Sequence, residues 1–300
     1  EDTVSHLITT DWDHDGRQDL LAISVTGQTL TPFIGIVNGN FLERPAIALV
    51  DTPNAIATGD FDADGWVDLV VADTANNTVR ILTNNQQPGI TTGSALSVGA
   101  SPSAVATGDL DGDGDTDIVV TNRAGNDFTV FTNPGGVGPW ESSQLNAGGT
   151  SPVGLVVTDF TDDGHADIVI AHAGSSSLSV LVNQGDGTFH LPVSISLGFS
   201  PAFVTAADMD SDGADDLVVL AEGGGTLAVL LNNTTVEHEI IGQDVGGTDY
   251  GDAPDTGAGT GSGNYQTLAA DGGASHTIVA GLRLGASVDS DSGLLQNARA

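Results

Sequence analysis

The stretch DLDGDGDTD, from Asp109 to Asp117, places five aspartates within nine residues. Carboxylates this close repel one another, so a compact fold needs a positive partner among them. Four more stretches repeat the pattern: DWDHDGRQD from Asp11, DFDADGWVD from Asp60, DFTDDGHAD from Asp159 and DMDSDGADD from Asp208. The first aspartates of successive stretches are 49, 49, 50 and 49 residues apart. The chain therefore contains five copies of a repeat of about fifty residues.

The negative charge of the chain is concentrated in these repeats. The 300 residues include 40 acidic and six basic ones, which gives a formal net charge of −34, and 22 of the acidic residues lie in the five stretches. This balance argues against nucleic acid or anionic lipid as a partner, because both need a basic surface, and it favours cations. No apolar run approaches the ~20 residues that cross a bilayer, so no membrane insertion is expected. The opening residues, EDTVSHLITT, show no signal peptide of their own.

Short apolar runs surround each acidic stretch. AVATGDL leads into the third one, DIVVTN leads out of it, and FTVFTN follows. Such runs, rich in Val, Ile, Ala and Thr and bounded by Gly, Asn, Asp or Pro, predict strands. Four strands in about fifty residues make one propeller blade, and a single blade cannot bury both faces of its sheet. We therefore predict an all-β fold, a β-propeller of five blades over residues 1–243, with small residues such as those of AVATGD on the innermost strands.

The acidic loop has the oxygen spacing that a calcium ion requires. Positions 1, 3 and 5 place oxygens on one side of a tight loop, glycine at position 6 permits the turn, and the carbonyl of position 7 can point inward. An EF-hand loop begins in the same way but needs a glutamate at position 12. These loops carry apolar residues there, namely Ala22, Val71, Val120, Ile170 and Val219. The last carboxylate comes at position 9 and a strand follows at once, so the loop closes a β-hairpin and is not an EF-hand.

The pattern D-x-D-x-D-G-x-x-D between two strands, with NQGDGTF from Asn183 to Phe189, resembles FG-GAP/VCBS-type repeats. These are the calcium-loop blades of integrin-like β-propellers in bacterial secreted and surface proteins. The resemblance implies about one Ca²⁺ per repeat, up to five, bound by side chains at positions 1, 3, 5 and 9 and by the backbone carbonyl of position 7. The implied ligands are Asp11, Asp13, Asp15, Arg17 and Asp19; Asp60, Asp62, Asp64, Trp66 and Asp68; Asp109, Asp111, Asp113, Asp115 and Asp117; Asp159, Thr161, Asp163, His165 and Asp167; and Asp208, Asp210, Asp212, Ala214 and Asp216. Because such propellers usually have seven blades, either a closed five-bladed ring or part of a larger ring is possible.

One loop departs from the pattern. In DFTDDGHAD position 3 is Thr161, and the additional acid, Asp162, occupies a position that is not a ligand. A hydroxyl binds calcium less well than a carboxylate, so we predict that this site is the weakest and that the loop at Asp109 is among the strongest. We expect the ions to be structural, since catalytic metals keep an open coordination position whereas these loops recur in every blade.

The composition changes after Gly242. Residues 244–300 contain no in-phase acidic loop, and their glycine content predicts linkers and turns. DYGDAPD, from Asp249 to Asp255, followed by ASHTI and LRLGASVD, is similar to the opening of GEVED-type domains of large bacterial surface proteins. We therefore expect a truncated GEVED-like segment that is partly disordered when expressed alone.

These patterns favour a non-catalytic calcium-binding scaffold of an exported bacterial protein, extracellular or at the cell surface. It would mediate adhesion or bind a protein or glycan; the identity of the ligand and the oligomeric state stay open. The alternatives are a calcium-dependent lectin and a polysaccharide lyase or hydrolase with a blade-top groove. An enzyme would need a cleft lined by His, Tyr or Arg beside a carboxylate. We assign Trp12, Trp66 and Trp140 to blade packing rather than to sugar stacking.

Overall fold

The computed structural model describes residues 4, 6–49, 53–85, 90–135, 139–223, 225–232, 248–249 and 276–277. These residues form 22 strands and one short 3-10 turn, η1 (Val37–Gly39). The chain divides into two compact units. The first holds residues 1–205 and 219–227, and the second holds residues 206–218 and 228–300.

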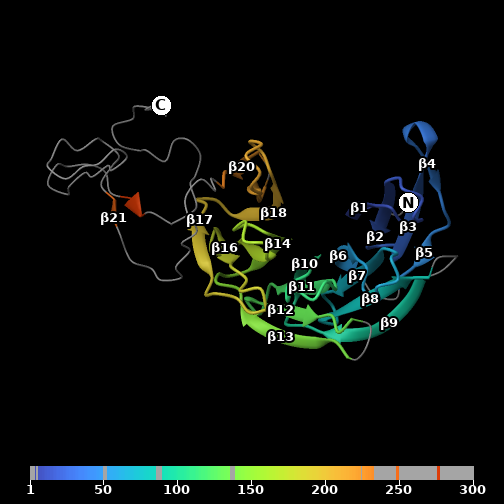
Figure 1. Ribbon diagram of the computed structural model, residues 1–300, viewed down its shortest axis with the longest axis horizontal. Coiled ribbons are helices and arrows are strands. Elements are labelled where there is room, and N and C mark those ends of the chain that lie inside the picture. Colours follow the sequence, from blue (N-terminus) through green and yellow to red (C-terminus); the bar gives the residue numbers. More distant parts are fainter. Residues whose placement is uncertain are drawn as a thin grey trace. The chain divides into compact units, whose positions relative to one another are not determined.

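Antiparallel strands that follow one another in the sequence form five blades (Figure 1). The first blade contains β1 (His6–Thr10), β2 (Asp19–Ser24), β3 (Thr29–Ile36) and β4 (Asn40–Glu43), with β5 (Ile47–Ala48) also paired to β3. The second contains β6 (Pro53–Gly59), β7 (Asp68–Asp73), β8 (Thr78–Asn84) and β9 (Ile90–Ser97). The third contains β10 (Pro102–Gly108), β11 (Asp117–Asn122), β12 (Asp127–Thr132) and β13 (Glu141–Asn146). The fourth contains β14 (Pro152–Thr158), β15 (Asp167–His172), β16 (Ser177–Leu181) and β17 (Val193–Ser196). The fifth contains β18 (Pro201–Ala207), β19 (Asp216–Ala221) and β20 (Leu227–Leu230).

This arrangement confirms the predicted all-β fold with five propeller blades. The strand predicted to complete the fifth blade, in VEHEII, lies outside the described residues. So does the predicted boundary between residues 243 and 244. Of the GEVED-like segment, the structure describes only β21 (Thr248–Asp249) and β22 (His276–Thr277), which pair antiparallel. Within the described part of the chain, no helix has the length and apolar character of a membrane span.

The core of the first unit lies between neighbouring blades. The second strands β7, β11 and β15 are buried along their whole length, whereas the outer strands β9 and β13 are mostly exposed. Each core cluster takes side chains from two successive blades. Phe128 of the third blade, for example, shares a cluster with Ile168 of the fourth. A blade therefore buries its apolar faces only against its neighbours, as expected of a repeat architecture.

The inner strands β6, β10 and β14 lie side by side (Figure 1). A Cβ at Gly108, the last residue of β10, would lie 2.7 Å from Cγ1 of Val157 in the next blade. The Thr107 hydroxyl donates a hydrogen bond to the carbonyl oxygen of Thr58 in the preceding blade, at 2.7 Å. Gly108 therefore has no room for a side chain, and the small residues of the AVATGD-type runs lie on inner strands, as predicted.

Candidate metal centre

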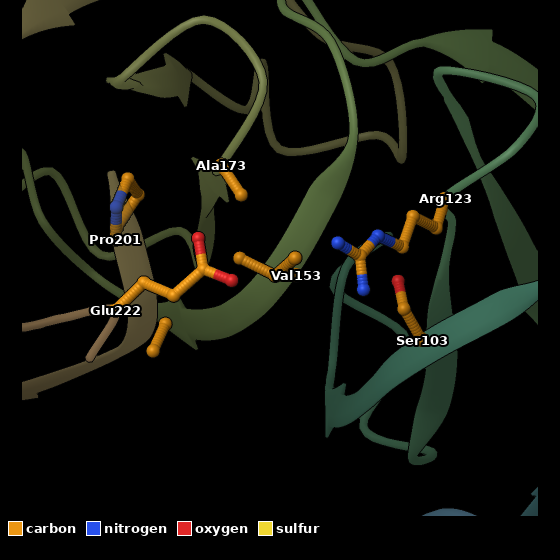
Figure 2. Close-up of a pocket in the computed structure, with 7 residues that line it drawn as sticks. Ser103, Arg123, Val153, Ala173, Pro201 and Glu222 are labelled. Atoms are coloured by element: carbon orange, nitrogen blue, oxygen red, sulfur yellow. The ribbon is translucent and has the colours of Figure 1, made fainter.

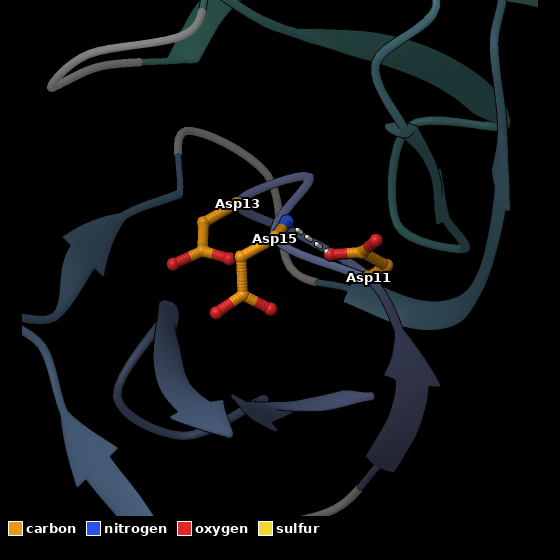
Figure 3. A group of neighbouring side chains, drawn as sticks. All are labelled: Asp11, Asp13 and Asp15. Atoms are coloured by element: carbon orange, nitrogen blue, oxygen red, sulfur yellow. Dashed lines mark hydrogen bonds between the residues drawn. The ribbon is translucent and has the colours of Figure 1, made fainter. Parts of the chain in front are cut away.

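Each acidic loop joins the first strand of a blade to its second strand, as the sequence predicts. Numbered from the first aspartate, position 6 is a glycine with φ between +83° and +96° in all five loops. A side chain would be strained in this left-handed conformation. Figure 3 shows the first loop, in which the carboxyl groups of Asp13 and Asp15 lie next to each other and the backbone N–H of Asp15 points to Asp11.

Hydrogen bonds from the backbone hold the aspartates of each loop in place. In the third loop, Oδ2 of Asp109 accepts the N–H of Gly114 at 3.0 Å, and Oδ1 of Asp113 accepts the N–H of Asp115 at 2.9 Å. The other four loops repeat both hydrogen bonds. The carboxylates at positions 1 and 5 are thus positioned by their own loop, and a cation needs to order little when it binds.

The aspartate at position 9 also braces the blade, a role that the sequence analysis missed. Its side chain is completely buried in every loop. In the third loop, Oδ2 of Asp117 accepts the N–H of Leu110 at 2.8 Å, and Oδ1 accepts the N–H of Asn133, just after β12, at 2.7 Å. The other loops repeat both contacts. One carboxylate therefore ties the loop to the end of the third strand.

Three carboxylates come together in four of the five loops. In each group the oxygens that could bind a metal lie within 4.8 Å of one another. The groups are Asp11, Asp13 and Asp15; Asp60, Asp62 and Asp68; Asp109, Asp111 and Asp117; and Asp208, Asp210 and Asp216. Position 3 belongs to every group, and the fourth loop, with Thr161 at that position, forms none among the described residues. The remaining implied ligands, including the carbonyls of position 7, stay predictions.

Crowding and burial make several of these carboxyl groups hard to ionise. Burial raises the pKa of the position-3 aspartates, and neighbouring carboxylates add to the effect; these are Asp13, Asp62, Asp111 and Asp210. Burial raises the pKa of three position-9 aspartates to about 6, although backbone N–H groups favour their charged form; these are Asp68, Asp117 and Asp167. A cation would stabilise the charged form of each group.

A buried oxygen at position 3 of the first loop tests whether the residues fit a cation. Oδ1 of Asp13 is buried and has no hydrogen-bond partner in the described part of the chain. Leaving a buried polar atom without a partner costs about 1–3 kcal/mol. A bound cation would give this oxygen a partner. Oxygen-only ligands suit hard cations such as Ca²⁺ rather than Zn²⁺ or Cu²⁺. The residues present therefore fit calcium.

The first loop also carries a cation of its own. The Arg17 guanidinium forms an ion pair with the Asp15 carboxylate. The two side chains are 48% and 30% exposed, and exposed pairs contribute only about 0–1 kcal/mol. The pair therefore neutralises Asp15 in part, but it does not replace a divalent ion.

An asparagine at or just after the end of the third strand links the second, third and fourth blades each to the preceding loop. Nδ2 of Asn133 donates to the carbonyl oxygen of Thr116 in its own loop and to that of Phe61 in the preceding loop, both at 3.2 Å. Asn84 and Asn183 make the equivalent pairs of hydrogen bonds. We call this contact the asparagine clasp. Because the same asparagine gives its backbone N–H to a position-9 aspartate, the clasp connects successive loops.

The first blade has glycine in place of the clasp asparagine. The backbone N–H of Gly35 binds Oδ1 of Asp19 at 2.6 Å, as the asparagines do in the other blades. A Cβ at Gly35 would lie 2.3 Å from the carbonyl oxygen of Gln18. A side chain therefore does not fit here, and the first blade cannot clasp a preceding loop in this way.

A pocket that the sequence analysis missed lies at the other ends of the inner strands (Figure 2). Its volume is about 260 Å³. It is lined by Ser103, Arg123, Val153, Ala173, Pro201, Ala202 and Glu222. The strand β10 starts at this pocket and ends at the acidic loop, so the strand separates the two features.

The tryptophans lie largely where blade packing predicts. Trp12 is buried in the core between the first two blades. Trp140 meets Phe61 edge to face, with ring centroids 6.0 Å apart. Trp66 lies beside His14, with centroids 5.3 Å apart, and links two successive loops at their surface.

The family of the chain follows from its repeats. A family model described as FG-GAP-like repeat matches residues 11–71, 60–120, 109–170 and 159–219. The chain belongs to the FG-GAP-like repeat family. Each match starts at the first aspartate of one loop and ends in the second strand of the next blade, so the four overlapping FG-GAP-like matches include all five loops. No curated protein matches the chain.

Solved structures share the fold at low identity. A lectin from Agrocybe aegerita, described as recognising non-reducing terminal N-acetylglucosamine, has a TM-score of 0.52 and 22% identity, over 76% of this chain and 63% of its own. A functionally unknown protein from Desulfotomaculum acetoxidans has a TM-score of 0.55 and 16% identity, over 72% and 63%. A Lactobacillus plantarum protein has a TM-score of 0.54 and 17% identity, over 77% and 67%. The chain thus spans less than two thirds of the first two, and the similarity shows the fold alone.

Proposed function

We propose that this FG-GAP-like propeller is a non-catalytic, calcium-binding scaffold of an exported bacterial surface protein that mediates adhesion or binds a protein or glycan. The observation that carries the proposal is the grouping of three carboxylates at the same place in four blades. A position-9 aspartate in each loop also bonds to the end of the third strand. An ion in the loop would therefore stabilise the blade as well as the loop.

An extracellular location suits such sites. Extracellular calcium modules often bind with dissociation constants of about 10⁻⁴ to 10⁻³ M, so their ions are retained only where calcium is plentiful. A chain with a net charge of −34 is also less self-repelling in saline surroundings than at low ionic strength.

A scaffold role is favoured over polysaccharide hydrolysis by the residues that line the pocket. Glycoside hydrolysis generally uses two carboxyl groups, whereas the pocket is lined by one carboxylate, Glu222, and by neither His nor Tyr. An arginine beside a carboxylate keeps the enzyme as the alternative to test. A calcium-dependent lectin is the other alternative, favoured by the fold shared with the Agrocybe aegerita lectin.

Two measurements test the proposal. Thermal unfolding of the full chain in calcium and in chelator should show a lower melting temperature in chelator, and an unchanged melting temperature would overturn the calcium role. A glycan array with and without chelator, followed by a product assay on every bound polysaccharide, separates the alternatives. Calcium-dependent binding without products supports the lectin, products support the enzyme, and no glycan binding leaves a protein partner.

A further inference from the structure

The pocket arises because one position of the repeat carries different residues in successive blades. The residue six places after the position-9 aspartate is Val25, Thr74, Arg123, Ala173 and Glu222 in the five repeats. Alanine in the fourth blade lies between an arginine in the third and a glutamate in the fifth, and all three line the pocket. The small side chain leaves room between two opposite charges, which Figure 2 shows with the carboxylate of Glu222 and the guanidinium of Arg123 on either side of Val153.

Serines of the neighbouring turns hold both charged side chains. Nε of Arg123 donates to Oγ of Ser151 at 2.9 Å. Oε2 of Glu222 accepts the hydroxyl of Ser200 at 2.8 Å, and the N–H of Glu222 donates to the carbonyl oxygen of Ser200 at 2.7 Å. Both turns precede a proline that starts an inner strand. Each of the two charged side chains is therefore held by the serine that precedes a proline at the start of an inner strand.

Several polar atoms of the Arg123 and Glu222 side chains make no hydrogen bond within the described residues. Within the described residues, Arg123 and Glu222 form no ion pair with each other, and the hydrogen bonds of their side chains use only Nε of one and Oε2 of the other. The two terminal amino groups of Arg123 and Oε1 of Glu222 are left for a ligand. The remaining lining is small or apolar, apart from Ser103.

These groups select one class of ligand. Glu222 and the net charge of −34 disfavour a simple anion, and Arg123 disfavours a simple cation. No aromatic side chain lines the pocket to stack on a sugar ring. A volume of about 260 Å³ is below the range of about 300–1,000 Å³ for drug-sized ligands. We propose that the pocket binds a small zwitterion, such as an amino acid, with its anionic group at Arg123 and its ammonium group at Glu222. This proposal goes beyond the scaffold role and does not rest on it.

Saturation-transfer NMR on the full chain in calcium tests the proposal. The probes are ω-amino acids from β-alanine to 6-aminohexanoate, with hexanoate and hexylamine as singly charged controls. Since one charge pair at 4 Å contributes about a factor of five even in water, at least one zwitterion should bind about fivefold tighter than both controls. Equal binding of all probes, or binding of N-acetylglucosamine but of no zwitterion, overturns the proposal.

Variants locate the binding. Arg123→Gln and Glu222→Gln should each abolish the preference for the zwitterion, whereas Arg44→Gln and Glu43→Gln, at exposed positions of the first blade, should leave it unchanged. The double exchange Arg123→Glu with Glu222→Arg should restore binding, because a zwitterion can reverse its orientation. An unchanged preference in the pocket variants overturns the proposal, and circular dichroism confirms that each variant is folded.

Discussion

Replacing Asp111 by asparagine should stabilise the metal-free protein and destabilise the calcium-bound protein. Asp111 forms a group with Asp109 and Asp117, whose oxygens lie within 4.8 Å of one another. Two unit charges at that distance repel by about 0.9 kcal/mol in water, which is a lower limit near a protein surface. Asp111→Asn removes two such repulsions, so metal-free protein should gain about 2 kcal/mol at low salt and pH 8.

Calcium should reverse the sign of this effect. A carboxylate oxygen about 2.4 Å from a divalent ion gains about 3.5 kcal/mol in the same medium. The variant loses this attraction and keeps only the relief of about 2 kcal/mol. The calcium-saturated variant should therefore be less stable than the wild type by about 2 kcal/mol.

Urea denaturation at pH 8, in chelator and in saturating calcium, measures both effects. Asp115→Asn is the matched control, because it removes one charge from the same loop but lies outside the carboxylate group. We expect a smaller change for the control, with the same sign in both conditions. If Asp111→Asn destabilises the protein as much in chelator as in calcium, carboxylate repulsion is not what the ion relieves.

Three further predictions concern the clasp, the pH dependence and the weakest loop. Asn183→Ala removes the two hydrogen bonds of the clasp, of 2.8 and 2.9 Å, and the one that Oδ1 accepts from the N–H of Gly185, and should lower the unfolding free energy by about 2 kcal/mol; a loss below about 0.5 kcal/mol in urea would argue against the clasp. Without calcium, the stability should fall as the pH rises from 4 to 6, because the folded state binds more protons there than the unfolded state. The groups responsible are the three position-9 aspartates whose pKa is raised to about 6, Asp68, Asp117 and Asp167. Unfolding in chelator at a series of pH values checks the slope, and a rise over the same range would contradict it. Thr161→Asp should strengthen calcium binding at the fourth loop by at least about tenfold, through one more charged ligand; calorimetric titration that shows no tighter site would refute the role given to position 3.

Local spacing in the sequence was enough to predict the blades and their loops. Glycine at position 6 and the absence of an acid at position 12 depend only on neighbours within the loop, so they could be interpreted without a structure. The double role of Asp117 could not, because its second partner, Asn133, lies 16 residues away. The clasp from Asn133 to Phe61 joins residues 72 apart, and nothing local marks either one.

The pocket was missed for a different reason. Arg123 and Glu222 are single charged residues in glycine-containing turns, and each is unremarkable by itself. Aligning the five repeats position by position would have placed them on either side of Ala173. The register of the repeats thus contains information on sites between blades that motif searches along one repeat do not use.

Each asparagine clasp runs from one blade to the loop of the preceding blade, so successive blades are linked in one direction. Asn133 holds a carbonyl of the second loop with its side chain and an aspartate of the third loop with its backbone. Ion release from one loop should therefore loosen the adjoining loop, and the first four sites should titrate as a coupled series with a Hill coefficient above one. The series of clasps begins after the first blade, because Gly35 occupies the clasp position there and has no side chain to bind a preceding loop. Under the proposed calcium role, a fall in calcium concentration would then destabilise the first four blades together, over a narrow concentration range, rather than one at a time.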